Sequence, residues 1–181
     1  GVLGWLIPSE FGGSDISDVE LTAGYEQLAT VCLASTFVLT QRNAAIQRIA
    51  RSGNEALKSD ILPALATDSI FATVGISHLT TSRQHWTKPA VAVERVDAGY
   101  IFHGEVPWVT GADNADLIVC GGTLHDGTQV LVALETNTEG VHIEPAVQLM
   151  ALNSSRTASV RLDNVFVSLE FLLYGQTEQV I

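Results

Sequence analysis

The feature that most constrains the fold is a change of sequence pattern near Thr67. Before this point apolar residues recur at helical spacing, and after it short runs rich in β-branched residues alternate with turn-forming residues. Such a switch of period indicates layers of different secondary structure within one chain. We therefore predict an α+β multidomain fold, in which a partial α-helical N-terminal domain over residues 1–66 precedes an antiparallel β-barrel or sandwich over residues 67–181.

Three helices are predicted in the first part of the chain. The run from Ser17 to Glu20 has the spacing of a capping box, in which a serine hydroxyl and a glutamate carboxylate satisfy free backbone donors at a helix start. A second helix is expected over residues 36–51. It should stop at Ser52-Gly53, because glycine readily adopts the left-handed conformation that follows many helices. A third helix begins at Asn54, and Pro63 should break or kink it near its end.

From residue 69 onward about seven strands are predicted. The runs "AVAVERV" and "YIFHGEV" flank a short "DAG" loop, which is typical of a β-hairpin. Short strands at regular spacing, separated by turns, are typical of an antiparallel barrel or sandwich. The other expected strands are "SIFATVGIS", "ADLIVCGG", "TQVLVALE", "VHIEP" and "ASVRLDNVFV".

Composition restricts the partners and the compartment. Only nine Lys and Arg stand against twenty Asp and Glu, which gives a net charge of −11. Nucleic-acid binding needs a dense basic surface, so no nucleic-acid partner is expected. No apolar run is long enough to span a bilayer, so no membrane insertion is expected. Cys32 and Cys120 lie in segments that we expect to be buried, and this usage predicts a cytoplasmic protein without disulfides.

Most familiar catalytic motifs are missing from the sequence. It has no His pair at helical metal-ligand spacing and no Cys-x-x-Cys, so no metal site is expected. It also has no nucleophile elbow and no nucleotide-binding fingerprint. His78 and His85 share one polar stretch, and surface or hydrogen-bonded core histidines are a better interpretation than acid–base catalysis.

Two stretches remain unusual. "VGISHLTTSR", from Val74 to Arg83, is a strand that runs into hydroxyl-rich residues able to contact a polar heterocycle or a phosphate, although a simple Ser/Thr turn explains it as well. If residues 107–110 are extended, Trp108 and Thr110 point to the same face. A flat indole beside a hydroxyl donor suits a planar aromatic ligand, and a tryptophan that closes the end of the barrel is the alternative.

Four segments in order resemble the acyl-CoA dehydrogenase family over nearly the whole chain. "GWLIPSEFGG" is similar to the family's Gly-x-x-x-Pro-Glu-x-Tyr-Gly-Gly loop, with Ser9 inserted between Pro and Glu. "GNEALKSDILPALATDSIFAT" is similar to its Gly-x-x-x-Gln-Lys-x-x-x-Leu-Pro-x-Leu-Ala-x-Gly segment. "GYIFHGEVPWVTGADNADLIV" resembles the Gly-Tyr-x-x-x-Gly-x-Lys-x-Trp-Ile-Thr-x-x-x-x-Ala-Asp signature, the most specific of the four. "LMALNSSRTASVRLDNVFVSLEFLL" resembles the closing Met-Gly-x-Arg-x-Ser-x-Thr-x-x-x-x-Phe-x-x-Val-x-Val-Pro pattern.

The resemblance implies an FAD site and a reaction. Thr110 would hydrogen-bond the isoalloxazine near N5, while Trp108 packs on the ring system. Ile76 and Ser77 would meet the pyrimidine edge, and Ser82 would meet the pyrophosphate. The implied reaction is α,β-dehydrogenation of an acyl-CoA thioester, with hydride passing to flavin N5. The resemblance also implies a homo-oligomer, because family members complete FAD binding across a subunit interface.

Several departures from the family pattern leave alternatives open. The family's glutamate base belongs to a C-terminal helical domain that these residues do not match, so we expect a fragment whose base is not in this chain. Its Thr-Glu-x-x-x-Gly-Ser-Asp motif is replaced by "SHLTTSRQHW", its lysine by Val106 and a glycine by Ala151. The alternatives are a flavin monooxygenase or nitroalkane-oxidase-like enzyme of the same fold, and a non-catalytic subunit or domain that binds no flavin.

Overall fold

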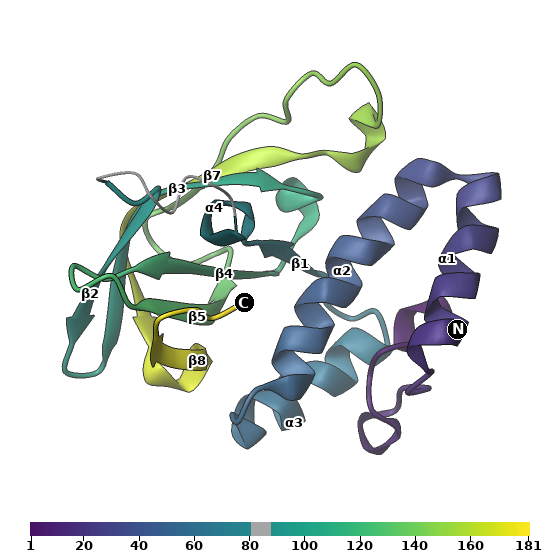
Figure 1. Ribbon diagram of the computed structural model, residues 1–181, viewed down its shortest axis with the longest axis horizontal. Coiled ribbons are helices and arrows are strands. Elements are labelled where there is room, and N and C mark those ends of the chain that lie inside the picture. Colours follow the sequence, from purple (N-terminus) through teal and green to yellow (C-terminus); the bar gives the residue numbers. More distant parts are fainter. Residues whose placement is uncertain (81–87) are drawn as a thin grey trace.

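The computed structural model describes residues 1–80 and 88–181, in which a helical layer lies beside a β-sheet (Figure 1). The predicted order, a helical region followed by a mostly antiparallel β region, is confirmed. The helical layer comprises the 3₁₀ turns η1 (Val2–Gly4) and η2 (Ser9–Phe11) and the helices α1 (Asp18–Val31), α2 (Leu33–Arg51) and α3 (Glu55–Ala66). The strands are β1 (Ala72–Gly75), β2 (Val91–Val96), β3 (Gly99–Val109), β4 (Leu117–Thr123), β5 (Gln129–Glu135), β6 (Val141–Ile143), β7 (Ala158–Ser168) and β8 (Leu172–Thr177).

Short helical turns connect several strands. Helix α4 (Ser77–Thr80) follows β1, and the 3₁₀ turns are η4 (Ala112–Asn114), η5 (Asn153–Ser155) and η6 (Leu169–Phe171). The segment between β6 and β7 arches beside the helical layer in Figure 1 and carries η5. The division into domains at residues 66 and 67 stays a prediction, although the structure does change from helix to strand in this region.

Two of the helix starts follow the predicted capping chemistry. The Ser17 hydroxyl accepts a hydrogen bond from the Glu20 backbone N–H at 3.3 Å, and the Glu20 carboxylate accepts one from the Ser17 N–H at 2.9 Å. The capping box at the start of α1 is therefore confirmed. At the start of α3, Asn54 Oδ1 accepts a hydrogen bond from the Leu57 N–H at 3.1 Å.

Three details of the helix predictions are corrected. Helix α2 begins at Leu33 instead of residue 36, because the Cys32 sulfur serves as its N-cap and accepts from the Ser35 N–H. It ends at Arg51 as predicted, but the left-handed conformation expected at Gly53 is not present, and the C-cap Ser52 is extended. Helix α3 is not broken at Pro63 but runs to Ala66; the proline gives up one backbone donor, while its own carbonyl accepts from the Thr67 N–H at 3.2 Å.

The sheet is mostly antiparallel, as predicted, and it also contains two parallel pairings that were not predicted. The strand order is β6-β7-β3-β2-β4-β5-β8, and β1 pairs with β4. The β1–β4 pairing is parallel, as is the short β2–β4 contact. Both β1 and β4 are buried on both faces, so their sequences lack the alternation that marks an antiparallel strand with one solvated face. Strand β8 was not predicted, because its last three residues are exposed and polar or glycine.

Two cores share the central strands. Along β4 the side chains alternate: Leu117 and Val119 face the helical layer, whereas Ile118 and Cys120 face the interior of the curved sheet. The helix-side core also contains Ile46 and Ile49 of α2 and Leu62 of α3. This packing holds α2 against β1 and positions the ends of β1 and β3, where the candidate site lies.

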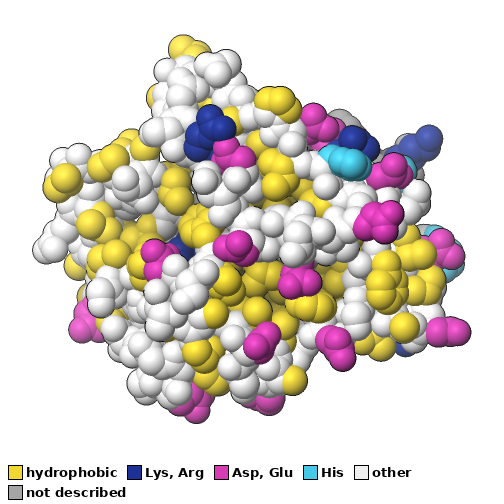
Figure 2. Space-filling model, turned by 180° about the vertical axis from the view of Figure 1, so that it is seen from behind, with side chains coloured by type: hydrophobic (Ala, Val, Ile, Leu, Met, Phe, Trp, Pro, Cys, Tyr) yellow, Lys and Arg dark blue, Asp and Glu magenta, His cyan; other side chains and the backbone are white. Residues whose placement is uncertain are grey.

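The described surface has few basic side chains. Figure 2 shows one face on which acidic side chains are scattered among apolar ones, with few Lys or Arg. In residues 1–80 and 88–181, no helix is long and apolar enough to cross a membrane.

Candidate functional site

The ends of β1 and β3 meet in a corner, which we call the β1–β3 corner and which comprises residues 73–77, 107–111 and 155–157. Thr73 Oγ1 donates a hydrogen bond to the Thr110 carbonyl at 2.7 Å. Ser77 Oγ donates to the Pro107 carbonyl at 3.2 Å. The structure thus brings together the two unusual stretches of the sequence, although about thirty residues separate them in the chain.

Trp108 departs from the extended conformation on which its predicted orientation depends. Its φ is +60°, in the left-handed region that is rare for a large side chain. The β3–β7 register shifts between Val106 and Val109, so one extra β3 residue forms a bulge there. Trp108 is 56 % exposed, whereas Thr110 is only 2 % exposed. The expectation that the two side chains share one face is therefore wrong, because the bulge turns the indole outward.

Thr110 belongs to a buried row of hydroxyls. Its Oγ1 lies 3.2 Å from Thr157 Oγ1, which lies 2.8 Å from Ser155 Oγ. Each hydroxyl carries a single hydrogen to donate. If Ser155 donates to Thr157 and Thr157 donates to Thr110, the Thr110 hydrogen remains free for an acceptor outside the row. If the row runs the other way, Thr110 presents only lone pairs.

Backbone and charge contacts hold this row in place. The Gly111 N–H donates to the Ser155 carbonyl at 2.9 Å, and Gly111 has a φ of +67° that other residues rarely adopt. Arg156 Nε donates to an Asp113 carboxylate oxygen at 2.7 Å, which joins η5 to η4. These contacts fix the loop after β3 against the loop before β7.

The remaining predicted residues lie around α4. Ile76 is partly buried and packs on the helix-side core. His78 is buried, and its Nε2 lies 2.9 Å from the Gly121 carbonyl, while no described group bonds its Nδ1. Burial lowers the pKa of His78, against a smaller opposing effect of the Gly121 hydrogen bond. Ser82, predicted at the pyrophosphate, and His85 lie outside the described residues.

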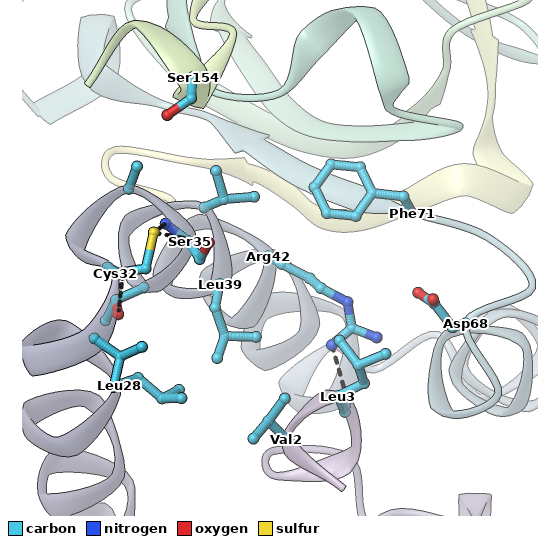
Figure 3. A pocket seen from close by; sticks show the side chains of 14 residues that line it. Val2, Leu3, Leu28, Cys32, Ser35, Leu39, Arg42, Asp68, Phe71 and Ser154 are labelled. Atoms are coloured by element: carbon cyan, nitrogen blue, oxygen red, sulfur yellow. Dashed lines mark hydrogen bonds between the residues drawn. The ribbon is translucent and has the colours of Figure 1, made fainter.

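A pocket of about 600 Å³ lies beside the corner, and sequence reasoning missed it. Figure 3 shows its lining side chains converging from α1, α2, η1 and the loop after α3. Ser154 and Phe71 form the wall nearest the β1–β3 corner. Most of the lining is apolar, including Leu28 and Leu39. Only the spacing of the apolar face on α2 could have pointed to it, and that spacing also fits ordinary core packing.

Two polar side chains mark opposite ends of this pocket. Cys32 is exposed, which corrects the expectation that it is buried. The hydrogen bond from the Ser35 hydroxyl, followed by that from the Ser35 backbone N–H, lowers the pKa of the Cys32 thiol. At the other end, Arg42 is 1 % exposed. Within residues 1–80 and 88–181, no group of three or more His, Cys, Asp or Glu is placed to hold a metal ion.

Comparison with known proteins finds similarity to one enzyme family. Residues 1–69 match the acyl-CoA dehydrogenase N-terminal domain. The short/branched chain specific acyl-CoA dehydrogenase of Bos taurus is 27 % identical over 172 residues, which cover 92 % of this chain and 39 % of that protein. The chain is similar to the acyl-CoA dehydrogenase family. The match covers the N-terminal and middle domains of the family, and the chain spans well under half the length of this relative.

Solved structures share the fold. The acyl-CoA dehydrogenase of Bacillus anthracis, solved as a complex with FAD, superposes with a TM-score of 0.86 at 22 % identity and covers 99 % of this chain and 31 % of that one. The prolyl acyl carrier protein oxidase AnaB superposes with a TM-score of 0.84 at 21 % identity, covering 97 % of this chain and 48 % of that one. At these identities the superpositions show a common fold, and they include both a dehydrogenase and an oxidase.

Proposed function

We propose that this chain forms the flavin-facing and acyl-facing part of an FAD-dependent acyl-CoA dehydrogenase-like oxidoreductase. The observation that carries the proposal is the β1–β3 corner, where the segments that carry Ser77, Trp108 and Thr110 meet next to an apolar pocket. A planar cofactor and an aliphatic substrate need adjoining surfaces of these two kinds. The reaction in this proposal is α,β-dehydrogenation of an acyl-CoA thioester.

The residues of the corner fit the ring part of FAD. The Trp108 indole is exposed and held outward by a strained backbone, as a surface for a flat ring requires. Ser77 is bonded to the Pro107 carbonyl, next to Trp108, and the row from Ser155 through Thr157 can orient the Thr110 hydrogen toward an acceptor. Ile76 supplies an apolar contact. Ser82 remains the proposed contact of the pyrophosphate.

The chemistry divides between the cofactor and the chain. FAD, when bound, supplies a two-electron oxidant that accepts hydride. Trp108 and Thr110 hold its ring in position, and the pocket excludes water from the acyl chain. We assign no described carboxylate to removal of the Cα proton, because Asp113 is paired with Arg156 and Asp68 lies exposed at the Arg42 end of the pocket. The base is proposed to come from outside residues 1–181.

The proposal is tested by flavin titration of the longest natural polypeptide that contains these residues. We expect FAD to bind with quenching of its fluorescence, because the ring stacks against Trp108. Thr110→Val should weaken FAD binding by about tenfold, the effect of losing one hydrogen bond to a polar ring. Thr138→Val, in the turn after β5, is the matched control and should bind as the unaltered protein does.

The outcomes separate the competing functions. Absence of FAD binding would overturn the proposal and favour a non-catalytic subunit. Anaerobic bleaching of bound flavin by acyl-CoA supports a dehydrogenase. Flavin that binds, resists acyl-CoA and reacts only with other substrates and oxygen would instead indicate a monooxygenase or nitroalkane-oxidase-like enzyme.

Assembly and location are also proposed. Several large apolar side chains are exposed, among them Val31 of α1 and Met150 of the segment between β6 and β7. Such side chains are common at interfaces, which favours a homo-oligomer. Light scattering of the purified protein tests the oligomer, and cell fractionation tests the proposed cytoplasmic location.

A further inference from the structure

One face of α2 lines the pocket from end to end. The pocket lining includes Cys32, Ser35, Leu39 and Arg42, which recur at helical spacing, and the backbone positions of the first and last are about 15 Å apart along the helix. Figure 3 shows Cys32 and the Arg42 guanidinium at opposite ends of the lining, with Leu39 between them. The pocket therefore has an exposed thiol end and a buried cationic end.

The hydrogen-bonding capacity of Arg42 is only partly used. One terminal nitrogen donates to the Leu3 carbonyl at 2.8 Å, and the other donates to the Leu65 carbonyl at 2.6 Å. The Nε atom is buried and has no hydrogen-bond partner among the described residues. Buried donors are nearly always satisfied by protein, water or ligand, so this one calls for an acceptor.

The charge of Arg42 is also unpaired at close range. None of the ion pairs found among the described residues includes it, and residues 81–87 contain no Asp or Glu. Burial lowers the pKa of Arg42, and the charge of Asp68 partly offsets that effect. Asp68 is exposed, however, so water weakens the attraction of its carboxylate without abolishing it. A buried cation without a close partner favours an anion in the adjoining apolar pocket.

We propose that Arg42 determines specificity, and that the pocket takes an aliphatic acyl group whose far end carries a carboxylate. The carboxylate lies at the Arg42 end and accepts a hydrogen bond from Nε, while the aliphatic chain runs along α2 toward Cys32. Leu3 and Phe71 close the Arg42 end and move aside as the ligand enters. The proposal rests on the proposed function only for the carrier at the other end of the acyl group.

Cys32 supplies a reporter of occupancy that needs no flavin. Iodoacetamide should alkylate Cys32 in the folded chain, and peptide mapping by mass spectrometry follows this residue alone. The other cysteine, Cys120, is fully buried, and burial raises the pKa of its thiol to about 12. Ligands that fill the pocket should slow alkylation of Cys32, so the concentration for half-protection reports affinity.

Three esters of equal chain length separate the effect of the end group from that of the aliphatic chain. They are monomethyl suberate, which ends in a carboxylate, the methyl ester of ω-hydroxyoctanoic acid, which ends in a hydroxyl, and methyl octanoate, which ends in a methyl group. Monomethyl suberate should half-protect Cys32 at a concentration about tenfold lower than methyl octanoate, with the hydroxy ester between them. Equal protection by all three would overturn the proposal, as would preference for the methyl end.

Substitutions test whether Arg42 causes the preference for monomethyl suberate. In Arg42→Met the preference for monomethyl suberate should disappear. In Arg48→Met it should persist, because Arg48 lies on the same helix, donates to the Ala44 carbonyl and does not line the pocket. A preference that survives Arg42→Met would show that Arg42 only holds the Leu3 and Leu65 carbonyls together, and would overturn the proposal.

A second variant keeps the test decisive if Arg42→Met does not fold. Asp68 is exposed, so Asp68→Asn should leave the fold intact while removing the charge that opposes an anionic ligand. The preference for monomethyl suberate should then increase, and an unchanged or smaller preference would count against the proposal. Flavin titration is independent of this assay, so failure of FAD binding and failure of carboxylate selection are distinguishable.

Discussion

The β1–β3 corner and the α2 pocket adjoin each other but are built differently. The corner is held by hydrogen bonds that join β1 and α4 to the end of β3, Thr73 to Thr110 and Ser77 to Pro107, and it contains a bulge at Trp108. The pocket is formed mainly by apolar side chains of α1 and α2 and by turns packed near them. A ring can thus be positioned by rigid backbone in the corner, whereas the pocket can change its selectivity through a few side chains.

The largest effect is expected where the corner has no free space. A Cβ added at Gly75 would lie 2.6 Å from Val106 Cγ1 and 2.9 Å from Val109 Cγ2, on the segment that carries Trp108. We expect Gly75→Ala to lower the free energy of unfolding by about 2 kcal/mol, as overpacking of a dense core does. Urea denaturation measures the change.

The matched control for Gly75→Ala is a substitution at Gly53, in the helical layer. No atom lies within 4 Å of a Cβ added at Gly53, and its φ is not in the left-handed region. Gly53→Ala should therefore change the free energy of unfolding by less than about 0.5 kcal/mol. Equal effects at Gly75 and Gly53 would mean that the corner is no more rigid than the helical layer.

The second-largest effect on stability is expected in the buried row of hydroxyls. Thr157→Val keeps the shape of the side chain but leaves Ser155 and Thr110 without their shared partner. We expect a loss of about 1–2 kcal/mol in the free energy of unfolding, because buried polar groups become unsatisfied. Ser159→Ala, two residues along β7 and partly exposed, should change it by less than about 0.5 kcal/mol. If both variants unfold at the same urea concentration, the row does not stabilise the corner.

The corner was easier to predict from sequence than the pocket. The segment around Trp108 and Thr110 stands out because its motif is continuous in the chain. Its backbone conformation could not be predicted, since the bulge depends on pairing with β7, about fifty residues later. The assigned FAD contacts of Ile76, Ser77, Trp108 and Thr110 stay predictions.

The pocket and part of the sheet depend on contacts between distant segments. Arg42 reaches the carbonyls of Leu3 and Leu65, and no local pattern indicates either partner. The parallel pairing of β1 with β4 was missed because a short apolar run predicts a strand but not its partner or direction. Capping boxes and hairpins were predicted correctly because their hydrogen bonds join residues only a few positions apart.

The two cysteines allow the sheet and the pocket to be compared by the pH dependence of stability. Cys120 lies in the sheet core, whereas Cys32 lines the pocket. Burial raises the pKa of Cys120 to about 12, above its value in the unfolded chain. Its contribution to stability is therefore complete below the unfolded pKa, near 8.5, and is lost as the pH rises toward 12. Between these two pH values, we expect the free energy of unfolding to fall by about an additional 1.4 kcal/mol per pH unit because of Cys120.

Comparison of variants isolates this contribution from other groups that titrate in alkali. Urea denaturation between pH 8 and pH 11 should show a shallower decline for Cys120→Val than for the unaltered chain. Cys32→Ser should retain the steep decline, because Cys32 is exposed in the folded state. Parallel curves for all three proteins would contradict the assignment to Cys120.

The smallest effect should come from the far wall of the pocket, which α1 contributes through Leu28 and Val31. Ser17→Ala removes the capping box that starts α1 and should cost about 1 kcal/mol in the free energy of unfolding, measured by thermal denaturation. Ser59→Ala, inside α3, makes the same chemical change without removing a cap and should have little effect or stabilise slightly. Because the loosened wall belongs to the pocket, Ser17→Ala should also weaken protection of Cys32 by monomethyl suberate while leaving the corner unchanged. Loss of FAD binding in this variant would show that the two regions are coupled rather than separately built.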